Sequence, residues 1–122
     1  MQIPQDAALL RIFTGETDRA DGKPLYEAVV LKAREVWLAG ATVIRGPMGF
    51  GHSSHLHTSK ILRLSEDLPV IVEIVDDEAK INTFLPVLDK MMGNGLVTIE
   101  KVKVLLQEGY DAAGLSLASE KI

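Results

Sequence analysis

The chain of 122 residues contains no cysteine, so it forms no disulfide and offers no thiolate for catalysis or metal binding. This absence suits a reducing compartment, and we expect a cytoplasmic protein. No apolar run approaches the roughly 20 residues of a membrane-spanning helix. The first ten residues also lack the basic stretch and apolar core of a signal peptide. The net charge of −4 argues against general binding to nucleic acid. We therefore expect neither membrane insertion nor nucleic-acid binding.

What is present is the composition of a globular protein, with 47% hydrophobic and 25% charged residues. The length predicts one domain that spans residues 1–122. The core of this domain is expected at about 7–107. Residues 108–122 show no clear periodicity, so they are expected to be a C-terminal tail that is loosely ordered or used at a subunit contact.

Apolar periodicity and turn residues predict four strands and two helices. The expected strands are 7–14, 41–46, 59–75 with its most apolar part at 70–75, and 96–106. The expected helices are 24–39, ended by Gly40, and 76–92, capped by Asp76 or Asp77. The Gly- and Asp-rich stretch 15–23 is expected to be a polar loop.

The order of these elements predicts an α+β fold of the ferredoxin-like split βαββαβ type. Such a fold has an antiparallel four-stranded sheet with two helices on one face. The nearly continuous apolar run at 70–75 predicts a central strand that is buried on both faces. Since two helices cover only one face of the sheet, the other face is expected to pack in an oligomer.

The stretch RGPMGFGHSSHLHTSK, residues 45–60, is long for a connection, basic at its ends and free of acids. Gly46, Gly49 and Gly51 permit positive φ and a close approach of ligand to backbone. Successive N–H groups in such turns can bind an anion, and Arg45 supplies charge suited to phosphate. The stretch therefore suggests a phosphate site. The alternative is that its glycines only form a long hairpin turn.

The three histidines of the chain, His52, His55 and His57, follow the pattern H-x-x-H-x-H. On an extended segment the last two point to the same side, and with the third they could hold Zn²⁺ or Cu²⁺. The alternatives are a solvated polar loop or one histidine against a ligand phosphate. The serines nearby have no acid that orients a catalytic base, so we expect no catalytic residues and no enzyme.

Four motifs occur together along the chain: G-K-P-L-Y-E, A-G-A-T-V, R-G-x-x-G-F-G and S-x-D-L-P-V. In this combination the chain resembles the PII-like family called domain of unknown function 190, from about Ala8 to Leu106. The resemblance implies a ferredoxin-like fold related to the trimeric PII signal-transduction proteins and to CutA. PII proteins bind ATP or ADP in clefts between subunits.

The resemblance also implies positions for a nucleotide. In PII proteins a G-F-G segment begins the long T-loop, and a G-D-G-K turn before the last strand holds phosphate. Here the second turn reads G-N-G-L, at 93–96, so its lysine is missing and the charge is expected from Lys101, Lys103 or Arg45. Thr42 is expected to approach the adenine. The implied nucleotide site comprises Thr42, Arg45, Gly46, Gly49, Phe50, Gly51, His52, Gly93, Asn94, Gly95, Lys101 and Lys103.

The implied protein is a cytoplasmic homotrimer that senses an adenine nucleotide, ADP or ATP, or a similar anionic metabolite, without a permanent cofactor. Ligand phosphate would order loop 46–60, which would then act on an unknown target protein. The loop is shorter than a PII T-loop and contains no tyrosine, so uridylylation of a tyrosine in it is excluded. The alternatives are a CutA-like metal-binding trimer that uses the three histidines, and a small enzyme that acts on a bound nucleotide.

Overall fold

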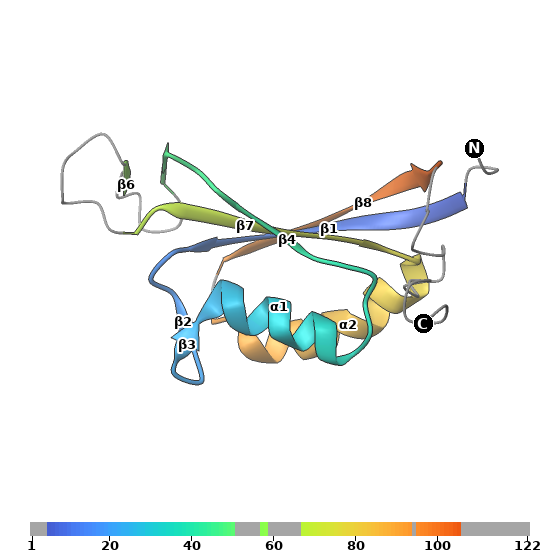
Figure 1. The fold of residues 1–122 in the computed structure, drawn as a ribbon, viewed down its shortest axis with the longest axis horizontal. Coiled ribbons are helices and arrows are strands. Elements are labelled where there is room, and N and C mark those ends of the chain that lie inside the picture. The colour runs from blue at the N-terminus through green and yellow to red at the C-terminus, as the bar shows by residue number, and fades with distance from the viewer. Residues whose placement is uncertain (1–4, 51–56, 59–66, 94, 106–122) are drawn as a thin grey trace, which may run out of the picture.

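The chain has the predicted α+β architecture in the computed structural model, which describes residues 5–50, 57–58, 67–93 and 95–105 (Figure 1). The main elements are β1 (Gln5–Gly15), α1 (Leu25–Glu35), β4 (Thr42–Arg45), β7 (Pro69–Asp76), α2 (Glu78–Met91) and β8 (Leu96–Val104). Two short hairpins add β2 (Arg19–Ala20) with β3 (Lys23–Pro24), and β5 (Met48–Gly49) with β6 (His57–Thr58). The expected residues 59–66 of the third strand lie outside the described residues.

The four long strands form one sheet in the order β4-β7-β1-β8, and every neighbouring pair is antiparallel. Both helices lie on the same face of this sheet (Figure 1). The first and third strands of the βαββαβ order occupy the centre, as the ferredoxin-like arrangement requires. The predicted fold class is confirmed.

The core lies between the central strands and the two helices. Alternate residues of β7, namely Val70, Val72 and Ile74, are buried on the helix side, and the residues between them are not. The predicted central position of this strand is confirmed, but its burial on both faces is wrong within the single chain, because Val75 is exposed. The core cluster comprises Ala8, Leu10, Ile12, Leu25, Val29, Ala33, Val72, Ile74, Ile81, Phe84 and Leu88.

Helix α1 ends at Glu35, earlier than predicted, and Trp37 rather than Gly40 takes the left-handed conformation, with φ of 67°. The N–H of Leu38 donates to the carbonyl of Ala33 at 3.0 Å. The N–H of Trp37 donates to the carbonyl of Arg34 at 3.1 Å. These two bonds form a Schellman motif, in which glycine usually occupies the left-handed position. The motif turns Leu38 back onto the core, and this packing outweighs the local preference for a glycine.

The two predicted caps of α2 have different roles. The carboxylate of Asp77 accepts the N–H of Ala79 at 3.1 Å and is the N-cap. Asp76 is the last residue of β7, is only 3% exposed, and accepts the N–H of Ala39 at 2.9 Å. Asp76 therefore ties the connection between α1 and β4 to the start of α2.

The stretch 15–23 is more ordered than the polar loop that its composition predicts. Asp21 and Gly22, with φ of 52° and 78°, form the two-residue turn between β2 and β3. Two successive residues with positive φ are typical of a type I′ hairpin, which the dipeptide Asp-Gly favours. Sequence reasoning overlooked this signal, because the flanking strands are too short to show alternation.

Neither helix in the described part of the chain is long and apolar enough to cross a lipid bilayer.

Candidate functional site

One end of the sheet gathers several of the predicted site residues, and we call it the loop end. Strand β4 finishes there with Arg45, opposite Val70. Strand β1 finishes there with Gly15, opposite Pro69, and β8 begins there at Leu96. The chain between β4 and β7 leaves the sheet at this end, so the conspicuous loop 46–60 starts from it (Figure 1).

Arg45 provides a positive charge at the loop end. One of its terminal nitrogens, Nη1, contacts the carboxylate of Glu16, and the other, Nη2, donates to the hydroxyl of Tyr26 at 2.9 Å. Its guanidinium carbon also lies 5.2 Å from the centroid of the Tyr26 ring. The bond to Tyr26, followed by the charge of Glu16, raises the pKa of Arg45, so the group stays charged. Because the Glu16 carboxylate already neutralises it, an anionic ligand would have to exchange with this carboxylate.

The turn after β1 fixes the position of Glu16. The N–H of Glu16 donates to the carbonyl of Leu68 at 2.9 Å, and the N–H of Thr17 donates to Asp67 at 2.8 Å. A Cβ on Gly15 would lie 2.4 Å from an Asp67 carboxylate oxygen, so a larger residue there would displace the Asp67 side chain. This turn is therefore held against the start of β7.

Sequence reasoning missed Glu16 and Tyr26 as members of this cluster. Tyr26 belongs to the G-K-P-L-Y-E motif, which was recognised in the sequence, but the motif gave no indication that Tyr26 contacts Arg45. Glu16 lies in a polar stretch where no periodicity distinguishes one acid from another. Only the antiparallel pairing of β1 with β7 and of β4 with β7 brings Glu16 to Arg45.

Gly46 and Gly49 have a packing role at the base of the loop. The N–H of Gly46 donates to the carbonyl of Pro69 at 2.8 Å. A Cβ on either glycine would lie 3.0 Å from the Pro69 Cγ, which is tighter than ordinary van der Waals contact. The close approach of this loop base to β7 is sufficient to explain both glycines. Their predicted role in holding phosphate stays a prediction.

The second glycine segment lies at the same end of the sheet but on the opposite edge. Gly95 has φ of 135°, and a Cβ there would lie 3.1 Å from the carbonyl oxygen of Phe13. Gly93 has open space around its Cα. Strands β4 and β8 are separated by three strand spacings, about 14 Å. One phosphate group therefore cannot contact both Arg45 and this segment within one chain.

The remaining predicted residues are spread along the sheet. Thr42 pairs with Glu73 near the middle of the sheet, and the register places it on the face away from the helices. Lys101 and Lys103 lie in the half of β8 that is far from the loop end. Lys103 donates to Asp6 at 2.5 Å, which lowers the pKa of that carboxyl. The lysines therefore do not join Arg45 within one chain.

Several predicted residues lie outside the described residues, namely Gly51, His52, His55 and Asn94. Phe50, just before this part of the loop, is 69% exposed, and His57 pairs with Gly49 in the β5–β6 hairpin. Within the residues that the structure does describe, no three His, Cys, Asp or Glu side chains gather as a metal site would require. The three-histidine metal site stays a prediction.

Solved structures similar to this fold include PII-like proteins. CPII from Thiomonas intermedia K12, a nitrogen regulatory PII-like protein solved with ADP, AMP and bicarbonate, aligns with a TM-score of 0.57 and 14% identity, covering 84% of this chain and 91% of CPII. A putative PII-like signaling protein from Thermus thermophilus aligns with a TM-score of 0.61 and 16% identity, covering 85% of this chain and 94% of that one. At this identity the similarity establishes a PII-like fold.

Sequence relatives are more similar. A UPF0166 protein of Aquifex aeolicus is 44% identical over 97 residues, which are 80% of this chain and 91% of the relative. The UPF0166 protein MJ1524 of Methanocaldococcus jannaschii is 36% identical over 106 residues, which are 86% of this chain and 97% of that protein. The model of the family DUF190, described as "Uncharacterized ACR, COG1993", matches residues 7–104. The chain belongs to the DUF190 family, the domain of unknown function 190 that its motifs resemble, and it has a PII-like fold.

Proposed function

We propose that the protein is a PII-like sensor that binds an adenine nucleotide, ADP or ATP, or a similar anion, between the subunits of a homotrimer. It acts by binding and not by catalysis. Loop 46–60 is the effector segment that responds to the ligand and contacts a target protein. The structurally similar CPII was solved with ADP, AMP and bicarbonate, which are anions of this class.

The observation that carries the proposal is the position of Arg45 at the base of the loop. Its guanidinium is nearly half exposed and is held by a carboxylate that a phosphate can replace. Exchange of Glu16 for a ligand phosphate would change the contacts at the last residue of β4, directly before loop 46–60. A ligand shifts the loop only by its different affinity for two loop states, and this exchange provides such a difference.

The uncovered sheet face supports the homotrimer. The register aligns one apolar row across all four strands, on the face away from the helices. This row consists of Ile44, Ile71, Phe13 and Leu96. Leu96 is 57% exposed, and Ile44 is exposed as well. A row of this kind is expected to be buried by further copies of the chain.

The edge strand β8 supports the same conclusion. Val97 and Ile99 are exposed although they point to the helix side, so no described element covers either face of β8 at these residues. The candidate binding residues lie on β4 and β8, which are the two opposite edges of the sheet. Packing of subunits around the free face would bring an edge of one chain close to another chain. A shared cleft would therefore complete a site that is divided within one chain.

Calorimetric titration with ADP, ATP and AMP tests the proposal. We expect binding by the wild type and a loss of about 1.5–3 kcal/mol in Arg45→Ala, since a hydrogen bond to a charged group is removed. Lys32→Ala is the matched control, because it removes another exposed ion pair, with Glu35, on the helix layer. Equal nucleotide affinity in Arg45→Ala and wild type would contradict the assigned site. Turnover of ATP during prolonged incubation would contradict a pure sensor.

A further inference from the structure

Trp37 exposes a large apolar side chain directly after helix α1. It is the only tryptophan of the chain, it is 70% exposed, and its backbone is left-handed. A residue with a Cβ is disfavoured in this conformation, and glycine would avoid the penalty. A large apolar side chain that is held in solvent by an unfavourable backbone indicates a binding surface.

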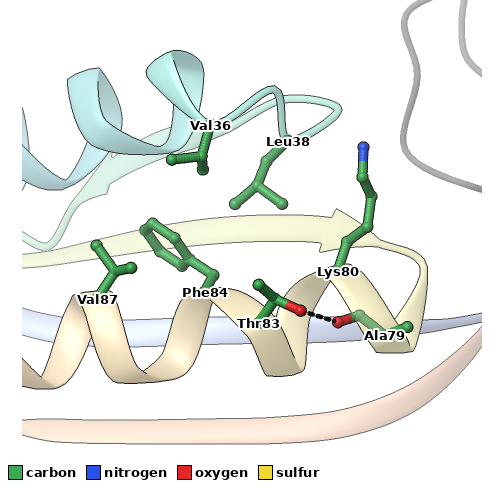
Figure 2. A pocket seen from close by; sticks show the side chains of 7 residues that line it. All are labelled: Val36, Leu38, Ala79, Lys80, Thr83, Phe84 and Val87. Carbon is green, nitrogen blue, oxygen red and sulfur yellow. Dashed lines mark hydrogen bonds between the residues drawn. The ribbon is translucent and has the colours of Figure 1, made fainter.

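An apolar pocket lies between the end of α1 and the first turns of α2 (Figure 2). It has a volume of about 250 Å³ and is lined by Val36, Leu38, Ala79, Lys80, Thr83, Phe84 and Val87. Figure 2 shows Val36 and Leu38 facing Phe84 across this pocket. Val36 and Leu38 are the two sequence neighbours of Trp37. The hydroxyl of Thr83 donates to the carbonyl of Ala79 at 2.9 Å, so this polar atom is satisfied and the lining stays apolar.

Lys80 is the one charged residue of the lining. Its Nζ donates to the backbone carbonyl of Trp37 at 3.3 Å, so it joins the pocket to the exposed tryptophan. The backbone of Trp37 therefore borders the pocket, and we call the pocket together with Trp37 the α1–α2 surface. This surface is apolar with a single cation, and it fits a segment that carries apolar side chains and an excess of acids.

The path of the chain brings such a segment to this surface. Strand β8 ends with Val104, which pairs with Gln5 at the start of β1. Near the same end of β1, Ala8 pairs with Asp76, the last residue of β7 before α2. The chain therefore leaves β8 at the end of the sheet where α2 begins, opposite the loop end. Residues 106–122 follow, and at about 3.3 Å per residue they can extend up to about 56 Å from this end of the sheet.

The sequence of residues 106–122 matches the surface. It contains Leu115 and Leu117, whose spacing of two would place them on one side if the segment were extended, as well as three acids and one lysine. The acids are Glu108, Asp111 and Glu120. The family match ends at residue 104, before this segment begins.

We propose that segment 106–122 docks on the α1–α2 surface, with Leu115 and Leu117 entering the pocket and covering Trp37. This contact explains why a tryptophan, and not a glycine, occupies the left-handed position after α1. It is independent of the nucleotide site, because the α1–α2 surface lies at the other end of the sheet from Arg45.

Fluorescence of the full-length protein tests the contact, since Trp37 is the only tryptophan that emits. In Leu115→Ser/Leu117→Ser we expect the emission maximum to move to longer wavelength and quenching by acrylamide to increase. The matched control Ser116→Ala/Ser119→Ala changes the same segment without removing its leucines, and its emission should equal that of the wild type. Identical emission from all three proteins, or the same shift in both variants, would overturn the proposal.

A reciprocal experiment examines the segment instead of the tryptophan. Thr83→Arg places a long cationic side chain in the pocket while leaving the segment unchanged. Brief digestion with chymotrypsin, read by mass spectrometry, should then cut after Leu115 and Leu117 faster than in the wild type. Thr83→Val, which keeps the pocket apolar, is the control and should be cut at the wild-type rate. Equal cleavage of Thr83→Arg and wild type would also overturn the docking.

Discussion

The carboxylate of Asp76 accepts the backbone N–H of Ala39 at 2.9 Å, although the two residues are 37 positions apart. It also accepts the N–H of Asp77 at 2.5 Å, so both of its oxygens are used. This pair closes the end of the molecule where α1 finishes and α2 begins. An acid that is buried in this way makes the stability of the fold depend on pH.

Burial raises the pKa of Asp76 above its ordinary value of 3.8, against the lowering effect of the two backbone N–H groups. The folded state therefore holds this proton more tightly than the unfolded state. The resulting stabilisation is present below about pH 3.8 and is lost as pH rises through the folded pKa. We therefore compare the unfolding free energies of the wild type and of Asp76→Asn. The wild-type value minus the Asp76→Asn value should fall as pH rises from about 3.8 through the folded pKa.

Chemical denaturation at several pH values measures this difference in unfolding free energy. Asp6→Asn is the control, because the same difference for Asp6 should change with pH in the opposite direction. The hydrogen bond from Lys103 lowers the pKa of Asp6, so its contribution is present above pH 3.8 and is lost as pH falls. The difference for Asp6 should therefore rise with pH. A difference for Asp76 that also rises with pH would refute the role assigned to its burial.

Glu16→Gln should strengthen binding of an anionic nucleotide. The substitution removes the carboxylate that competes for Arg45 but keeps a side chain of the same size. An exposed ion pair contributes about 0.2–1 kcal/mol, so we expect affinity to rise about 1.5- to 5-fold. Calorimetry compares the nucleotide affinity of Glu16→Gln with that of Tyr26→Phe. The second variant is the control, because it removes the other partner of Arg45 and keeps the Glu16 carboxylate. A loss of affinity in Glu16→Gln would show that this carboxylate does not compete with the ligand.

Gly93 and Gly95 offer a matched pair that separates folding from binding. Gly95→Ala forces a Cβ into φ of 135°, at 3.1 Å from the Phe13 carbonyl oxygen, and should cost about 1–3 kcal/mol of unfolding free energy. Gly93→Ala meets open space and should leave the stability within about 0.5 kcal/mol of wild type. Thermal unfolding of both variants checks this order. If Gly93→Ala nevertheless weakens nucleotide binding, Gly93 serves the ligand and not the fold.

Arg11 should control assembly. It lies in the middle of the uncovered sheet face and donates to Glu73 at 2.8 Å and to Glu100 at 2.6 Å. Arg11→Ala leaves two carboxylates without their cation on the face that we propose to bury, so the oligomer should dissociate toward monomer. Lys103→Ala, which breaks an ion pair at the far end of β8, is the control. Light scattering that gives the same mass for Arg11→Ala and wild type would exclude this face from the contact.

The layout of the fold could be predicted from the sequence, because strands and helices leave different apolar periods. Apolar β-favouring runs for the strands, three- and four-residue apolar spacing for the helices, and the turn residues between them were sufficient to give the βαββαβ order. The end of α1 was not predictable from local signals. Gly40 has the better intrinsic preference, but the return of Leu38 to the core decides that Trp37 turns the chain.

The candidate site was predicted only in part, for a related reason. Glycines and Arg45 could be recognised by residue type, and the structure places Arg45 and four glycines of the expected set at one end of the sheet. Glu16 and Tyr26 could not be assigned, because their proximity to Arg45 is created by strand pairing. Lys101 and Lys103 were expected as phosphate ligands, but their register on β8 separates them from Arg45 within one chain.

Strand β8 has a consequence for the way the protein is made. No strand among the described residues pairs with its outer edge, and both of its faces carry exposed apolar side chains, among them Leu96 and Val97. In the homotrimer that we propose, a newly synthesised subunit with such an edge is prone to aggregate until other subunits cover it. If this assembly forms, dilution should lower the temperature at which the protein unfolds, and synthesis of several copies close together in time and space would protect the edge of β8.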